Sequence, residues 1–222
     1  IFVVGWPYKI SQKILEIPKG GIIGFHPSKL PKDRGRSVLA WQIEDGYKKT
    51  ALTMFYLKKN VDQGDIIDQF TINIGIKDYI NDILDKVDYA TLKLFEKNFK
   101  QIIFKKNKRK IQNENLSSYR KLRNESNSKI DWNNKSNNIY NKIRAISKPY
   151  PGATADIGGV IYKVWKASVV SGVDAPPGSF IQYDSRGIVV ACGRDGLQLE
   201  SLQLAGKRRT DAKTFVTQID LR

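Results

Sequence analysis

The sequence predicts an α/β protein with a mostly parallel sheet, followed along the chain by a small antiparallel β barrel. Over residues 1–103, apolar strand-type runs alternate with helical patterns, which is typical of helices layered on a mostly parallel sheet. A stretch rich in lysine and asparagine then interrupts this pattern. Short strand-type runs separated by turn residues fill the end of the chain, as in small antiparallel barrels.

The first region contains the elements of the expected sheet. Its strands are the apolar runs at residues 1–6, 22–25, 50–57 and 66–74. Ser11 is the expected N-cap of a short helix at residues 12–17, and Ser37 caps a second helix that ends before Gly46. Apolar residues recur at helical spacing from Lys77 to about Ile103, which predicts a long helix.

The rest of the chain divides into a linker and a second domain. Residues 104–136 lack apolar periodicity, and we expect a basic linker that winds over the surface between domains at 1–103 and 137–222. A helix at residues 137–147 stops before Pro149. Four strand-type runs follow, at residues 160–170, 178–183, 187–192 and 197–204. Thr210 is the expected cap of a last helix, residues 211–219.

Composition limits the class of protein. A hydrophobic content of 41% with 27% charged residues is ordinary for a folded globular chain. No apolar run reaches the roughly 18–20 residues that span a bilayer, so we expect no membrane partner. The single cysteine, Cys192, cannot form an internal disulfide, which favours a cytoplasmic location. The chain begins on an apolar run without methionine, and we expect N-terminal structure to be missing.

The net charge of +16 is concentrated in one stretch. Residues 93–148 carry 16 basic and 4 acidic groups and so contribute +12 alone. Such a block can bind the phosphates of a nucleic acid. The same stretch holds ten asparagines between Asn107 and Asn141, a combination that an AT-rich coding bias also produces. Both interpretations remain open.

Two titratable residues stand at expected strand ends. His26, the only histidine, ends the run at residues 22–25 and opens the loop "HPSKLPKDRGR". Asp62 lies in the glycine-containing turn "VDQGD" between two expected strands. A lone histidine is more often a packing residue and a turn aspartate more often a turn former. Ligands of α/β sheets bind beyond strand ends, however, where the carboxylate could orient or charge the imidazole.

This pair carries a family resemblance. The stretch "FHPSKLPKDRGR", followed 36 residues after its histidine by the aspartate of "VDQGD", resembles the 10-formyltetrahydrofolate-dependent formyltransferases. More specifically, it resembles the branch of the methionyl-tRNA and amino-sugar nucleotide enzymes. The matching residues are His26, Ser28, Leu30, Pro31, Arg34, Gly35, Asp62 and Gly64. Stretches at 147–153, 163–167, 175–179, 189–193 and 202–209 resemble the C-terminal barrel of that branch.

The resemblance implies a fold and a reaction. It implies a partial Rossmann-like formyltransferase domain, followed by an OB-like barrel. The reaction is transfer of a one-carbon formyl group from the cosubstrate 10-formyltetrahydrofolate to a primary amine. His26 would help to take the proton of the amine, and Asp62 would hold the imidazole. The catalytic asparagine of the family is replaced by Gly24, and loss of one oxyanion donor typically costs about a hundredfold in rate. A glycine could leave room for a water or a backbone amide as donor.

The resemblance also implies binding residues, with no metal. The folate would lie between the loop of residues 5–10 and the Asp62 turn; its expected contacts are Gly5, Trp6, Tyr8, Asp62, Gln63, Gly64, Asp65 and Ile66. Ser28, Arg34 and Arg36 would bind acceptor phosphates, although bracing of the loop is an equal alternative for Ser28 and Arg34. Trp6 lines the pocket or simply packs, and Trp165 is expected in the core.

Three functional alternatives remain. The sequence "RGRS" favours a nucleotide-linked amino sugar as acceptor, because a second arginine follows the glycine in that branch. The basic block and the barrel favour methionyl-tRNA instead. A degenerate, non-catalytic homologue that binds folate or RNA is the third alternative. An independent oligonucleotide-binding barrel is disfavoured, since residues 149–222 are nearly neutral and lack surface aromatic pairs.

Overall fold

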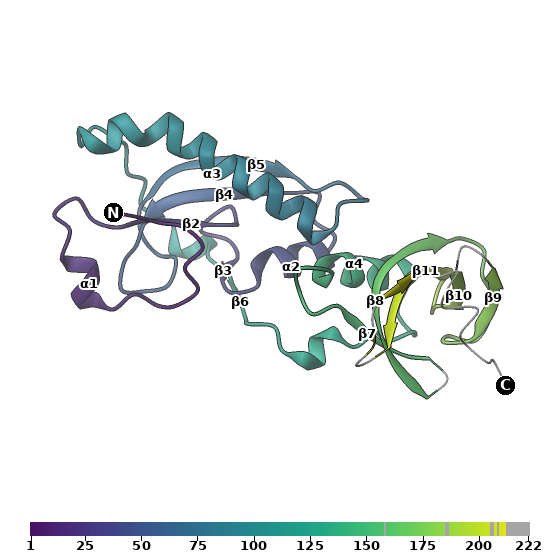
Figure 1. Ribbon diagram of the computed structural model, residues 1–222. Helices are drawn as coiled ribbons and strands as arrows, with labels where there is room; N and C mark the ends of the chain where they lie inside the picture. The colour runs from purple at the N-terminus through teal and green to yellow at the C-terminus, as the bar shows by residue number, and fades with distance from the viewer. Residues whose placement is uncertain (158, 185–186, 205–206, 208, 212–222) are drawn as a thin grey trace. The chain divides into compact units, whose positions relative to one another are not determined.

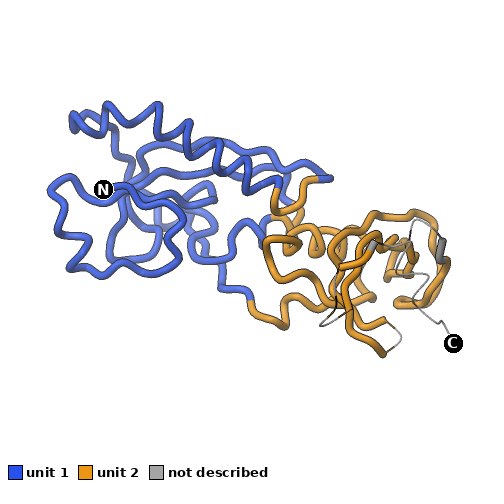
Figure 2. Tube along the Cα trace, viewed as in Figure 1, with its two compact units in different colours: residues 1–42, 47–77, 82–123 blue, residues 43–46, 78–81, 124–222 orange. Residues whose placement is uncertain are grey.

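The computed structural model describes residues 1–157, 159–184, 187–204, 207 and 209–211. The chain forms two compact units, coloured separately in Figure 2. Unit 1 comprises residues 1–42, 47–77 and 82–123, and unit 2 comprises residues 43–46, 78–81 and 124–222. The expected linker at residues 104–136 is divided between these units.

Unit 1 contains a four-stranded sheet in the order β1 (Phe2–Val3), β2 (Ile23–His26), β4 (Lys49–Tyr56) and β5 (Ile66–Asn73). The α/β class is confirmed. The expectation of a mostly parallel sheet is wrong for these strands, because only β1 and β2 pair in parallel. For β4 and β5 the physical reason is their connection, a turn without a crossover helix, which joins neighbouring strands in antiparallel.

Three helices belong to this region of the chain, α1 (Gln12–Glu16), α2 (Val38–Glu44) and α3 (Ile80–Ile103). Helix α3 runs along the sheet beside β4 and β5 (Figure 1), and Ala90 and Leu94 enter the same apolar cluster as Leu52 and Met54. This long helix is confirmed. Ser11 takes the N-cap position of α1, but its side chain makes no capping hydrogen bond.

Most residues of the segment at 104–123 are exposed, as expected for a surface linker, but the segment belongs to unit 1 and is anchored to it. Its short strand β6 (Tyr119–Arg120) pairs in parallel with β3 (Arg34–Gly35), which lies in the loop after His26. A 3-10 helix, η1 (Glu114–Leu116), precedes β6, and Gln112 is buried. Sequence periodicity did not indicate this anchoring, because polar contacts of Gln112 and the β3–β6 pairing, and not an apolar face, hold the segment.

Unit 2 is built on an antiparallel sheet, as expected. After η2 (Glu125–Ser128) and α4 (Ser136–Ile146), the strands follow in the sheet order β7, β8, β11, β10 and β9, with β12 on β11. Their bounds are Ala153–Ile157 (β7), Val160–Val170 (β8), Phe180–Asp184 (β9), Gly187–Ala191 (β10), Gly196–Leu204 (β11) and Thr210–Asp211 (β12). Figure 1 shows the long strands strongly curved.

Two expectations for unit 2 need correction and two are confirmed. Strand β7 was missed, since its run "ATADI" is short and rich in alanine. Thr210 pairs in β12 and does not cap a helix, and the rest of the expected last helix lies outside the described residues. Trp165 and Cys192 are buried, as core residues should be. Among the described residues, no helix has both the length and the apolarity needed to cross a membrane.

Candidate active site

His26 is fixed by its place in the sheet and by its ring contacts. It is the last residue of β2, where Thr53 of β4 is its partner, and it is 6% exposed. The ring Nε2 lies 2.8 Å from the carbonyl oxygen of Asp33. A carbonyl oxygen only accepts, so Nε2 must carry the proton and donate it. The other ring nitrogen, Nδ1, lies near the side chain of a second acidic residue.

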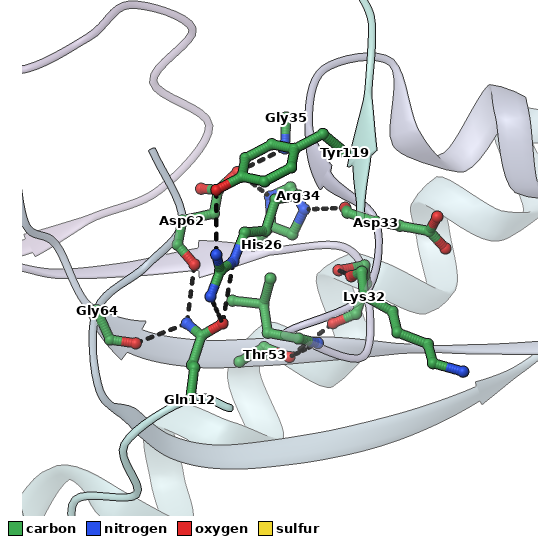
Figure 3. A network of polar contacts seen from close by, with 12 residues as sticks. His26, Lys32, Asp33, Arg34, Gly35, Thr53, Asp62, Gly64, Gln112 and Tyr119 are labelled. Atoms are coloured by element: carbon green, nitrogen blue, oxygen red, sulfur yellow. Dashed lines mark hydrogen bonds and ion pairs between the residues drawn. The ribbon is translucent and has the colours of Figure 1, made fainter. Parts of the chain in front are cut away.

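The carboxylate of Asp62 lies beside the His26 ring, with its Oδ2 3.4 Å from Nδ1 (Figure 3). The same oxygen accepts a 2.8 Å hydrogen bond from the backbone amide of Gly35. Asp62 has a φ of 56°, in the left-handed region, which costs a residue with a Cβ about 1–2 kcal/mol. Backbone strain of this kind is typical of functional sites.

The arrangement can perform proton transfer. With Nε2–H held by Asp33, the unprotonated nitrogen of a neutral imidazole is Nδ1, which can accept a proton. The Asp62 carboxylate lies 3.4 Å from this nitrogen, where it can orient the ring. The two side chains that the sequence placed at separate strand ends do lie together.

The glycine of the Asp62 turn is required by packing. A Cβ on Gly64 would overlap the carbonyl oxygen of Tyr56, so no other residue fits at this point of the turn. Nearby, the Gln63 side chain donates a 2.7 Å hydrogen bond to the hydroxyl of Tyr119. Asp65 forms a 2.7 Å ion pair with Lys58, and Ile66 is buried at the start of β5. The folate-binding assignment of residues 62–66 remains a prediction.

Ser28 and Arg34 face inward and have partners within the protein. The Ser28 hydroxyl donates a 2.7 Å bond to the carbonyl of Lys32. The Arg34 guanidinium, 0% exposed, donates to both oxygens of Glu114 at 2.7 and 2.8 Å. The hydrogen bond with Glu114 raises the pKa of Arg34, and the same bond lowers the pKa of Glu114. Of the two roles left open, this geometry fits bracing of the loop.

Arg36 differs from these residues because its side chain is exposed. Its backbone amide donates to the carbonyl of Arg120, which fixes its position after β3. The guanidinium can therefore reach a phosphate in solution. Binding of an acceptor by Arg36 remains a prediction.

The folate-binding residues expected in the loop of residues 5–10 lie at the surface. Trp6 is 60% exposed and Tyr8 is 72% exposed, and their rings meet edge to face at 5.8 Å. Gly5 precedes them with a φ of 65°. Exposed aromatic faces suit stacking against a flat heterocycle. Their assignment to folate rests on the resemblance alone.

The space beside Gly24 is filled. Gly24 and His26 lie two residues apart in β2, so their side-chain directions point to the same face. A Cβ on Gly24 would lie 2.6 Å from Cδ2 of Leu57. Leu57 therefore fills the space beside Gly24 in which a water was expected.

Sequence reasoning missed Gln112, Glu114 and Tyr119, which all contact Arg34. One signal could have indicated them. Glu114 is the single acidic residue between Glu96 and Glu125, within a strongly basic stretch. A lone carboxylate there suggests a specific cationic partner.

Two open cavities of about 510 Å³ each lie apart from these residues. The first is lined by Glu44, Asp45, Asp131, Asn134, Asn138, Ile139, Asn141 and Lys142. The second is lined by Asp68, Gln69, Phe70, Lys93, Leu94, Glu96 and Lys97. Neither includes His26 or Asp62, so the candidate site is identified by its side-chain chemistry.

Sequence comparison identifies relatives over nearly the whole chain. The profile of the family "Formyl transferase" matches residues 1–98, and "Formyl transferase, C-terminal domain" matches residues 123–219. The bifunctional polymyxin resistance protein ArnA of Wigglesworthia glossinidia brevipalpis is 34% identical over 87% of this chain and 29% of its own length. The methionyl-tRNA formyltransferase of Macrococcus caseolyticus is 32% identical over 93% of this chain and 66% of its length. The chain thus spans less than two thirds of these relatives.

The methionyl-tRNA formyltransferase of Alkaliphilus oremlandii is 31% identical over 97% of this chain and 70% of its own length, a larger share than in the two relatives above. Among solved structures, HypX from Aquifex aeolicus in complex with tetrahydrofolic acid has a TM-score of 0.79 at 16% identity. The match covers 97% of this chain and 38% of the HypX chain, and it shows a shared fold. The N-formyltransferase from Helicobacter canadensis, in complex with folinic acid and dTDP-3-aminofucose, has a TM-score of 0.63 at 26% identity, over 80% of this chain and 65% of its own. This chain belongs to the formyl transferase family.

Proposed function

We propose that the protein is an N-formyltransferase that moves a formyl group from 10-formyltetrahydrofolate to a primary amine. The observation that carries the proposal is the pair of His26 Nδ1 and Asp62 Oδ2, 3.4 Å apart. Membership of the formyl transferase family supports the same reaction. Solved relatives bound to tetrahydrofolate or folinic acid support the identity of the cosubstrate.

In the proposed mechanism, the acceptor amine attacks the formyl carbon and loses a proton. His26 takes this proton at Nδ1, because Nε2 is already committed to Asp33. Asp62 stabilises the resulting imidazolium, which can return the proton to the departing folate nitrogen. General acid–base catalysis of this kind contributes roughly 10²–10⁴-fold to a rate.

We propose a nucleotide-linked amino sugar as the acceptor. Its diphosphate would meet Arg36, which is exposed directly after Gly35 in the His26 loop. The Helicobacter canadensis relative was solved with dTDP-3-aminofucose, an acceptor of this class by its name. The primary amine of such a sugar would have to reach Nδ1 of His26.

Methionyl-tRNA is the second candidate, favoured by a different observation. Residues 93–148 contribute a charge of +12, and the exposed side chains of this stretch include Lys105, Lys106, Lys108, Arg109 and Lys110. Many curated relatives are named methionyl-tRNA formyltransferase. A polyphosphate acceptor would benefit from such a block.

One assay tests the reaction and both acceptors. The whole gene product is incubated with 10-formyltetrahydrofolate and either nucleotide-linked amino sugars or methionyl-tRNA, and released tetrahydrofolate is measured. Release with a sugar supports the first candidate, and release with methionyl-tRNA supports the second. No release with any amine would contradict the proposal and indicate a non-catalytic homologue. Filter binding of tRNA over a salt series gives an independent readout, since binding through phosphates weakens steeply as salt rises.

A further inference from the structure

Gln112 lies buried between the Asp62 turn and the loop that contains β3, at 6% exposure. Its Nε2 donates to the carbonyl of Asp62 at 2.8 Å and to the carbonyl of Gly64 at 2.7 Å. Its Oε1 accepts from Nε and Nη2 of Arg34 at 3.2 and 2.7 Å. A carboxamide offers two donor hydrogens and two acceptor sites, and here all four are used.

The orientation of this carboxamide is determined by its surroundings. Arg34 can only donate and the two carbonyls can only accept, so the oxygen must face Arg34 and the nitrogen must face the turn. Glu114 holds both terminal nitrogens of Arg34 and so keeps the guanidinium in place. Figure 3 shows Gln112 directly beside Arg34, Asp62 and Gly64.

The two carbonyls that Gln112 binds flank Gln63 and define the path of the turn. Asp62 is left-handed there, a conformation that a non-glycine residue keeps only when its neighbours impose it. The direction of the Asp62 side chain, and therefore its 3.4 Å approach to His26, depends on this backbone. Removal of the amide donors would leave both carbonyls without this partner and allow the turn to relax.

We infer that Gln112 is a positioning residue for formyl transfer: it holds the Asp62 turn so that the carboxylate faces Nδ1 of His26. This inference rests on the proposed function. The segment at residues 110–120 is then a third component of the site, besides the His26 loop and the Asp62 turn. Gln112 acts through Asp62 and touches neither imidazole nor substrate in this scheme.

The test compares two glutamines that brace the same loop. Gln112→Met keeps the length of the side chain, adds no charge and removes every hydrogen bond. Gln69→Met is the matched control, because Gln69 donates to the Leu30 carbonyl at 3.0 Å and to Thr53 Oγ1 at 2.9 Å, away from the Asp62 turn. Asp62→Asn supplies the reference for loss of the carboxylate.

The first readout is independent of activity. His26 is the only histidine, so the nitrogen-15 NMR signals of a histidine ring belong to it without assignment work. The Nδ1 signal of Gln112→Met should move toward that of Asp62→Asn, while Nε2 stays near its wild-type position because Asp33 still accepts from it. Gln69→Met should keep both wild-type signals.

The second readout is steady-state kinetics with the accepted amine. Gln112→Met should lose about 10–100-fold in kcat with little change in KM, the cost of a small misplacement of a catalytic group. A wild-type Nδ1 signal in folded Gln112→Met would overturn the inference. If this variant fails to fold, Gln112→Asn, a shorter and neutral arm, is judged by the same signals. If the wild-type protein transfers no formyl group, the proposed function fails while the NMR comparison still decides the role of Gln112.

Discussion

The region around His26 in unit 1 and the sheet of unit 2 bury different kinds of side chain. In unit 1 the residues around His26 form a polar interior, and the fully buried side chains there include Ser28, Arg34 and Thr53. In unit 2 the sheet is filled by aliphatic residues, among them Val164, Leu197 and Leu202, each 0% exposed. Burial of a polar group costs free energy unless the group is hydrogen-bonded, whereas aliphatic side chains pack without directional partners.

This difference determines how far each region tolerates substitution. An aliphatic core tolerates substitutions of similar volume, but a polar network fixes one arrangement of its members. The network in unit 1 holds the loop after His26 and the Asp62 turn, and Asp33 and Asp62 have φ values of 54° and 56°. The candidate chemistry thus lies where the chain is held most specifically. The following predictions test this contrast, from the largest effect to the smallest.

The largest effect should follow loss of either member of the pair. His26→Ala and Asp62→Asn should each lower the rate of formyl transfer by roughly 10²–10⁴-fold, because the proton acceptor or its counter-charge is removed. Release of tetrahydrofolate measures the rate, and circular dichroism checks that the fold is kept. Rates near wild type in both variants would contradict the assigned roles.

Two buried arginines distinguish the units directly. Arg34→Met should lower the free energy of unfolding by about 2 kcal/mol, less than the roughly 3–5 kcal/mol of fully buried pairs, because Glu114 is 58% exposed. Formyl transfer should fall as well, since the loop after His26 loses its brace.

Arg144→Met is the matched variant in unit 2, where Arg144 is 1% exposed and donates to Asn141 and to the carbonyl of Asp78. Its loss should lower the free energy of unfolding by roughly 1–3 kcal/mol and leave the transfer rate unchanged. Denaturant unfolding and the transfer assay measure both quantities. A lower rate in Arg144→Met would remove the functional distinction between the units.

A smaller gain is expected from restoring an amide beside His26. Gly24→Asn, combined with Leu57→Ala to clear the 2.6 Å overlap, should raise the transfer rate by about tenfold, below the 10²–10³-fold effect of a mature oxyanion donor. Gly24→Leu with the same Leu57→Ala change controls for bulk and should not raise the rate. Equal rates in the two double variants would show that no amide is needed at this position.

The smallest effect concerns acid stability. Burial alone would raise the pKa of Asp68, but hydrogen bonds from Lys97, Asn98 and the Gln69 amide together lower it. A lowered folded-state pKa stabilises the protein above the unfolded value of about 3.9, and the stabilisation is lost as the pH falls below it. Asp68→Asn should therefore flatten the acid limb of a stability–pH curve.

Asp131 provides the comparison in unit 2. The Asn133 side chain lowers its pKa by a hydrogen bond, but the carboxylate is exposed, so solvent screens its effect on stability. Asp131→Asn should flatten the acid limb less than Asp68→Asn does. Thermal unfolding between about pH 3 and pH 7 checks the order, because this range extends from about one unit below the usual pKa of Asp to neutrality. A larger change in Asp131→Asn than in Asp68→Asn would contradict the prediction.

Much of the fold could be predicted because its elements have local causes. Helix α3 follows from apolar residues at helical spacing, and the strands of unit 2 follow from apolar runs between turn residues. The direction of strand pairing in unit 1 could not be predicted from alternation of patterns, since it depends on which strands become neighbours after folding. The attachment of Gln112 and Tyr119 to the loop could not be predicted, because these polar contacts span 78–85 positions of sequence.

The sequence by itself determined the family, the histidine and aspartate at strand ends, and the glycine where the family has an asparagine. These features are local: a motif, a spacing and a residue type. Only the tertiary structure decided that Arg34 is a buried brace, that Leu57 fills the space beside Gly24 and that Gln112 joins two loops. Each of these depends on which atoms meet after folding, because hydrogen bonds and overlaps act over a few ångströms and leave no periodic pattern in the sequence.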